Sequence, residues 1–129
     1  MKLDISYNLI ESFACLKDLH LPKLEALDIS NNLLQTLDSI VILNSVSPNL
    51  TTLSLANNCI HDLSGLKELN LKKLAHVDLS ANKLTLSEDQ NLRKLTYMSD
   101  ALETLDLRGN PAPESYDESA EFDENETIK

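Results

Sequence analysis

The chain has 129 residues, enough for one domain with a hydrophobic core and too few to require a second. Leucine fills 27 positions, against two glycines, five aromatic residues and no tryptophan, and so uniform a core composition predicts internal repetition. The net charge is −10, of which residues 111–129 supply −6 from seven acidic residues and one lysine. This negative field disfavours nucleic acids and anionic membrane surfaces and favours a basic protein as partner.

Five copies of one short pattern follow one another along the chain. A clipped copy, "LDISYN", begins at Leu3, and the later copies are "LEALDISNN", "LTTLSLANN", "LAHVDLSAN" and "LETLDLRGN". Two apolar positions alternate with polar ones in each copy, which predicts a short strand with one buried face. An asparagine follows three residues later, at spacings of 24, 26, 24 and 28 residues, and occupies Asn8, Asn32, Asn58, Asn82 and Asn110.

The pattern LxxLxLxxN resembles the leucine-rich repeat family over residues 1 to about 112. The resemblance implies an α/β fold, a curved right-handed solenoid with short parallel strands on its concave face and helices or 3₁₀ turns on its convex face. Adjacent strands would lie about 4.8 Å apart with their leucines turned inward. An asparagine amide both donates and accepts, so it can satisfy backbone groups at each bend out of the sheet.

The segments between the copies predict the convex side. After Leu37, "DSIVILNSV" predicts a short helix that Asp38 or Ser39 caps and that ends before Pro48. The segments ending "LHLPKL" and "LNLKKL" predict short turns or single 3₁₀ turns. The stretch "SEDQNLRKLTYM" predicts a helix at about residues 88–98, because Ser87 and Gln90 form a capping-box pair.

Both ends depart from the repeat. We expect a solenoid of about five repeats over residues 1–112, the first truncated, and a C-terminal cap with an acidic, partly disordered tail over residues 113–129. The run Gly-Asn-Pro at 109–111, with Tyr116 beyond it, resembles the start of the cap in cytosolic members of the family. Met1 falls at the second position of a repeat, so we expect either a fragment of a longer parent or a first strand covered by another chain. Otherwise we expect a monomer.

Cysteine and histidine do not predict a chemical site. Cys15 and Cys59 lack CxxC spacing, which favours reduced core residues over a disulfide framework or a zinc site. His20, His61 and His76 fall in different registers of the repeat, and only His76 is predicted on the concave face. There is no glycine-rich phosphate loop, nucleophile elbow or HExxH motif, so we expect neither an enzyme nor a cofactor or metal site.

The concave face is the predicted binding surface, because repeat proteins usually bind partners there. Its central positions read Asp, Asp, Ser, Asp, Asp, which would suit lysine or arginine side chains of a partner; the alternative is that these residue types are merely common in such slots. The flanking positions also include Lys2, Ser6 and Ala56. The candidate partner-binding residues are Asp4, Tyr7, Ala26, Asp28, Ser30, Asn31, Thr52, Ser54, Asn57, His76, Asp78, Ser80, Thr104, Asp106 and Arg108.

Three functions fit the sequence. The first is a non-catalytic protein–protein interaction module, similar to the intracellular phosphatase-1 regulatory-subunit and dynein light-chain subgroups of the family. The second is a binder of histones or a phosphatase, since residues 47–86 and the acidic end resemble the acidic leucine-rich nuclear phosphoproteins. The third is a fragment of an extracellular recognition receptor. Neither a secretion-signal pattern nor an apolar stretch of about 18 residues occurs, so we expect a cytoplasmic or nuclear location.

Overall fold

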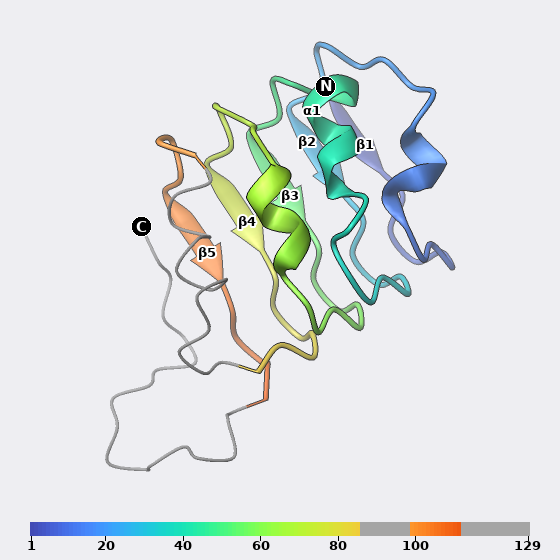
Figure 1. Ribbon diagram of the computed structural model, residues 1–129, viewed down its shortest axis with the longest axis vertical. Coiled ribbons are helices and arrows are strands. Elements are labelled where there is room, and N and C mark those ends of the chain that lie inside the picture. The colour runs from blue at the N-terminus through green and yellow to red at the C-terminus, as the bar shows by residue number, and fades with distance from the viewer. Residues whose placement is uncertain (86–98, 112–129) are drawn as a thin grey trace.

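A computed structural model of the chain describes residues 1–85 and 99–111 (Figure 1). Five strands form one parallel sheet in chain order. In the register, Leu27 of β2 lies between Leu3 of β1 and Leu53 of β3. The strands are β1 (Lys2–Asp4), β2 (Ala26–Asp28), β3 (Thr52–Ser54), β4 (His76–Asp78) and β5 (Thr104–Asp106). This sheet confirms the predicted α/β repeat solenoid.

The apolar alternation of each copy builds the core. In the second repeat, Leu27 and Ile29 are both buried, and the corresponding residues of the next repeats are buried as well. In the first repeat, Leu3 and Ile5 are only partly buried and pack against the core from its N-terminal end. The core is therefore a column of stacked leucine layers whose order follows the order of the repeats.

The returning segments supply short helical pieces. They are the 3₁₀ helices η1 (Phe13–Leu16), η2 (Ile40–Ile42) and η3 (Ser64–Glu68) and the α-helix α1 (Leu43–Val46). Figure 1 shows them along one face of the sheet. The predicted short helix after Leu37 and its end before Pro48 are confirmed, as are the short 3₁₀ turns. The helix predicted at 88–98 lies outside the described residues.

None of these described helices is long and apolar enough to cross a membrane.

The predicted cap of the helix after Leu37 is wrong in its chemistry. Ser39 occupies the N-cap position of η2, yet its side chain makes no capping hydrogen bond there. Its hydroxyl instead accepts a hydrogen bond from the backbone N–H of Phe13 at 2.9 Å and lies 3.0 Å from the Ser12 hydroxyl. Ser39 therefore joins two successive repeats rather than closing its own helix.

The prediction that both cysteines are core residues is also wrong. Cys15 is exposed and Cys59 is half-buried, and both thiols are free. Cys15 lies in η1, where Phe13 and Leu16 are the buried pair. Residues three apart share one face of a 3₁₀ helix, so the two positions between them, one of which is Cys15, point outward.

The asparagine ladder is confirmed, and it links neighbouring repeats. Asn32, Asn58, Asn82 and Asn110 are all buried. The Asn58 amide donates to the carbonyl of Leu55 in its own turn at 3.1 Å and to the carbonyl of Ile29 in the preceding repeat at 3.0 Å. Its Oδ1 accepts from the backbone N–H of Leu34, also in the preceding repeat, at 3.0 Å. Each ladder asparagine of this kind therefore fixes the spacing between two turns of the solenoid.

Candidate protein-binding surface

The face of the sheet opposite the helical segments is the open face, which is the face predicted as concave. The register aligns one side chain from each strand into a central row, here called the aspartate column. Its members are partly buried or exposed. The column consists of Asp4, Asp28, Ser54, Asp78 and Asp106, and a second row on the open face consists of Lys2, Ala26, Thr52, His76 and Thr104.

The aspartates of the column close the bend that follows each strand. Oδ1 of Asp28 accepts a hydrogen bond from the backbone N–H of Ser30 at 2.9 Å and another from its hydroxyl at 2.6 Å. The same backbone bond forms from Ser80 to Asp78 at 2.9 Å. Asp4 and Asp106 each accept the same bond from the backbone N–H of the residue two positions later in the chain. These are Asx turns, a structural role that the Asp-x-Ser spacing could have indicated and that the sequence analysis missed.

The structure corrects the expected exposure of Ser30. Its side chain and backbone both bond Asp28, and the residue is only 9% exposed. Ser30 therefore offers little surface to a partner, although Asp28 beside it is only partly buried. In the first repeat the same two bonds, from the Ser6 hydroxyl and then its backbone N–H, hold the pKa of the Asp4 carboxyl below its usual value.

The residue after the bend has a left-handed backbone in every repeat. The φ angles are 57° at Tyr7 and Asn31, 55° at Asn57 and 54° at Ala81, and Gly109 follows with 75°. Asparagine and glycine are favoured in this region, so Asn31 and Asn57 suit the bend itself. The Asn57 amide also donates to Oδ1 of Asn31. The sequence predicted Asn31 and Asn57 only as partner-binding residues. Their left-handed backbone conformation explains why asparagine occurs at these positions.

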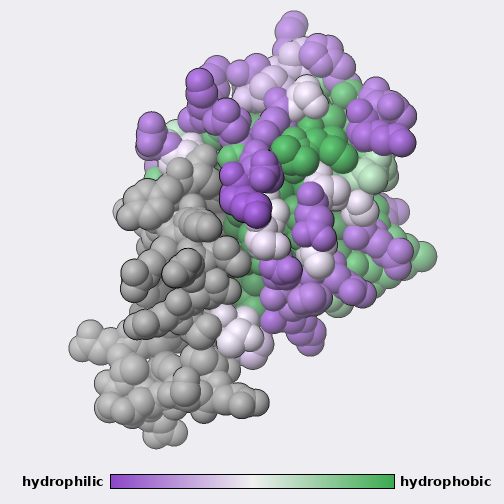
Figure 2. Space-filling view, viewed as in Figure 1, coloured by the Kyte–Doolittle hydropathy of each residue, from purple (hydrophilic) through white to green (hydrophobic). Residues whose placement is uncertain are grey.

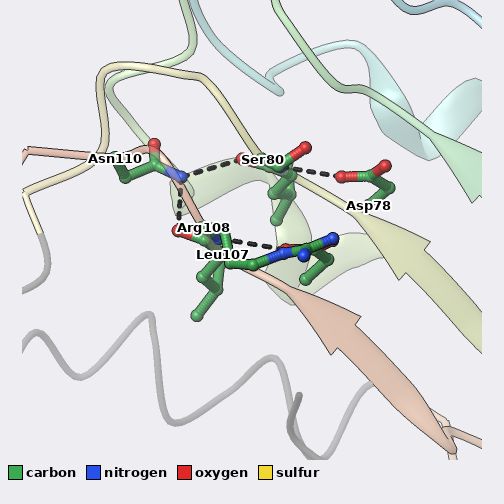
Figure 3. Close-up of polar contacts among 7 residues, drawn as sticks. Asp78, Ser80, Leu107, Arg108 and Asn110 are labelled. Atoms are coloured by element: carbon green, nitrogen blue, oxygen red, sulfur yellow. Dashed lines mark hydrogen bonds and ion pairs between the residues drawn. The ribbon is translucent and has the colours of Figure 1, made fainter. Parts of the chain in front are cut away.

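The C-terminal end of the column carries an internal cation. Arg108, labelled in Figure 3, bonds the Asp106 carboxylate, with Nη2 to Oδ2 at 2.6 Å and Nε to Oδ1 at 2.9 Å. This contact lowers the pKa of the Asp106 carboxyl and raises that of the Arg108 guanidinium, to which the charge of Asp78 also contributes. A planar guanidinium pairs two carboxylate oxygens well. Asp106 is therefore paired with a cation of the chain itself.

His76 lies on the open face between β3 and β5. Its Nδ1 is 2.8 Å from the Thr104 hydroxyl, and its Nε2 is 3.6 Å from the Glu103 carboxylate. Within the described ranges, no three His, Cys, Asp or Glu side chains gather as a metal site would require. His76 thus takes part in a surface polar network.

Two hollows lie on the described surface. One, of about 280 Å³, lies over β3, β4 and β5 and includes His76, Asp78 and Asp106 in its lining. A larger one, of about 590 Å³, lies where the strands begin and carries Lys23, Glu25 and Lys73, a mixture of charges away from the aspartate column. The first falls below the roughly 300–1,000 Å³ typical of small-molecule pockets.

The strand register, the leucine layers and the asparagine ladder together define a repeat solenoid with an open parallel sheet. Residues 48–94 match the family model described as leucine-rich repeats in two copies. This match over part of the chain supports the leucine-rich repeat superfamily that the sequence pattern predicted. The comparison with curated proteins finds no match. The family points to a protein–protein interaction module, and its members are typically non-catalytic.

Proposed function

We propose that this chain is a non-catalytic module that binds a basic partner protein through the open face of its sheet. The partner would place lysine or arginine side chains along the aspartate column. The proposed partner-binding residues remain those predicted from the sequence, with Ser30 contributing through its hold on Asp28 rather than through its own surface.

The observation that carries this proposal is the pairing of Arg108 with Asp106. The chain's own guanidinium binds a column carboxylate in the geometry that a partner's arginine would use at Asp4, Asp28 or Asp78. Among the described residues, hydrogen bonds to Asp28 and Asp78 reach Oδ1 alone. The second oxygen of each carboxylate is therefore available, and a charge-assisted bond to it would be stronger than a neutral one.

Binding of a histone or a phosphatase, or recognition outside the cell, are narrower functions that we rank below the general binding of a basic protein. A histone would satisfy the requirement for a basic surface, and a phosphatase is the other partner that the resemblance to acidic nuclear phosphoproteins suggests. Two free cysteines support a reducing compartment, consistent with a cytoplasmic or nuclear location. This argument favours an intracellular binder over a fragment of an extracellular receptor.

The test removes the negative charge of one aspartate at a time and keeps the Asx turn that its side chain closes. Asp28→Asn and Asp78→Asn retain a carbonyl oxygen that accepts from the backbone N–H two residues on. Asp62→Asn is the matched control, because Asp62 accepts the same kind of bond from Ser64 at 2.8 Å but lies in the loop before η3. All three variants carry the same net charge.

The assay compares proteins captured from a cell extract by the four chains at low and high salt. We expect Asp28→Asn and Asp78→Asn to lose salt-sensitive capture of a basic protein that wild type and Asp62→Asn retain. Equal capture by all four chains would overturn the assignment of binding to the column. Turnover of a substrate by the purified chain would contradict a purely non-catalytic role.

A further inference from the structure

Exposed apolar side chains gather beside the N-terminal end of the aspartate column. Tyr7 is 79% exposed, Leu9 is 81% exposed and Leu33 is 40% exposed. We call these three residues the apolar edge. Figure 2 shows hydrophobic surface at the lower right, where Figure 1 places the loop after β1. Large side chains left in water in this way mark interaction surfaces when they are contiguous.

The repeat register explains why these residues lie together. Leu9 and Leu33 each follow a ladder asparagine, and the backbone N–H of Leu33 donates to the carbonyl of Ile10 at 2.8 Å. The two turns are therefore direct neighbours. The same position holds Cys59, which is half-buried, in the third repeat and Lys83, which is exposed, in the fourth, so the two adjacent leucines occur in the first two repeats.

Tyr7 joins this edge to the column. Its backbone N–H donates to the carbonyl of Ser30 at 3.1 Å, immediately beside the bend that Asp28 closes. Tyr7 also has a φ of 57°, a conformation that is uncommon for a bulky residue. The equivalent residues in the next two repeats are asparagines, which adopt this backbone more readily.

Charge separates the two ends of the column. Asp4 and Asp28 are register neighbours, and the bonds given to their carboxylates come from serines, which carry no charge. At the other end, Arg108 occupies Asp106 and adds positive charge near Asp78. Lys2 acts on Asp4, since its charge contributes to the lowered pKa of that carboxyl, whereas Asp28 forms no salt bridge among the described residues. The N-terminal end therefore combines the unpaired carboxylate of Asp28 with apolar surface.

We infer that the N-terminal half of the open face, with the apolar edge, is the docking surface for a partner segment that carries apolar side chains next to lysines or arginines. The apolar side chains pack on Tyr7, Leu9 and Leu33, and the cations lie on Asp4 and Asp28. The inference rests on the proposed function and locates it in one half of the sheet. Charge complementarity selects this occupant, because a second copy of this chain, at −10, would bring further acidic surface.

The test uses variants that the chain's own repeats suggest. Tyr7→Asn places at the first bend the residue found at the second and third, and Leu9→Ser changes a side chain that is largely in solvent. Both leave the core intact. Val41→Ser is the matched control for Leu33→Ser, since Val41 is 39% exposed but lies in η2 on the helical side.

The probe is a synthetic peptide with two leucines followed by three lysines, labelled for fluorescence anisotropy. Matched peptides replace the leucines with serine or the lysines with glutamate. We expect Tyr7→Asn, Leu9→Ser and Leu33→Ser each to weaken binding about tenfold, with Val41→Ser unchanged. Both matched peptides should bind more weakly than the probe. Backbone amide shifts on peptide addition should concentrate at residues 4–10 and 28–33.

Three results would overturn the inference. If Asp28→Asn weakens binding but the apolar-edge variants do not, the column binds cations and the proposed function stands without its apolar part. If none of the variants changes binding of the peptide, both the proposed function and this inference are wrong. If sedimentation shows that the chain self-associates and that Tyr7→Asn or Leu9→Ser abolishes the dimer, the apolar edge is an interface between copies of this chain.

Discussion

Replacing Asn58 with alanine should test whether the asparagine ladder holds the repeats together. Asn58 is buried, and its side chain bonds backbone groups of two successive repeats. Alanine has a compatible backbone preference but no amide. The change therefore removes the side-chain hydrogen bonds and leaves the leucine layers in place.

The expected cost follows from what each backbone group retains. The buried N–H of Leu34 has Asn58 as its acceptor, so the substitution leaves it unpaired at a cost of about 1–3 kcal/mol. The carbonyls of Ile29 and Leu55 each keep a second donor from a neighbouring ladder asparagine, so each loss costs about 0.5–1.5 kcal/mol. The free energy of unfolding should thus fall by about 2–6 kcal/mol, a large share of the roughly 5–15 kcal/mol typical of a domain.

Urea denaturation followed by circular dichroism measures this change. The matched control is Asn8→Ala, because Asn8 occupies the same slot but is exposed and bonds two carbonyls of its own turn, those of Ile5 and Ser6. We expect that control to change the free energy of unfolding by less than about 1 kcal/mol. If Asn58→Ala were no more destabilising than Asn8→Ala, the bonds between repeats would not be what makes the ladder stabilising.

Three other predictions concern stability. Ser47→Ala should leave the free energy of unfolding unchanged or raise it by about 1 kcal/mol in urea denaturation, because the Ser47 hydroxyl is 0% exposed and has no hydrogen-bond partner among the described residues; a loss above that size would reveal a partner. Gly65→Ala should lower the melting temperature, since a Cβ there would lie 1.9 Å from the Leu37 carbonyl oxygen and force the backbone to move; an unchanged melting temperature would contradict this packing. Arg108→Ala should lower the free energy of unfolding at neutral pH and have a smaller effect well below pH 3.8. The reason is that Arg108 depresses the pKa of Asp106 in the folded state. The stabilisation from this pair is therefore present above the usual carboxyl pKa of 3.8 and is lost as the pH falls through the lower pKa of the folded state. A difference between wild type and variant that stays constant with pH would contradict that linkage.

The repeated sequence was sufficient to predict the sheet. Leu27 and Ile29 alternate with polar residues, and Asn32 follows at a fixed distance, so each copy specifies the same strand and bend. A pattern repeated at nearly equal spacing leaves few ways to bury all its leucines other than stacking the copies. The residues of β1 to β5 and the buried positions were predictable for that reason.

The partners of polar side chains were harder to predict. Asp38 or Ser39 was expected to cap the helix after Leu37, but the structure places the Ser39 hydroxyl on the backbone of the preceding repeat. Asp28 was expected only on the binding face, yet it also closes a turn. The bond of Ser39 depends on distances that exist only after the repeats stack, whereas the Asp28 turn lies within one repeat and could have been predicted from the Asp-x-Ser spacing.

The sequence by itself therefore determined the class of fold, the inward leucines and the asparagine ladder, because periodicity alone sets them. The tertiary structure decided which surface residues are free to recognise a partner. It buried Ser30, exposed Cys15 and set Arg108 against Asp106, while Asp28 forms no salt bridge among the described residues. Those outcomes depend on side-chain directions and hydrogen-bond geometry in the folded backbone, which the residue pattern alone does not specify.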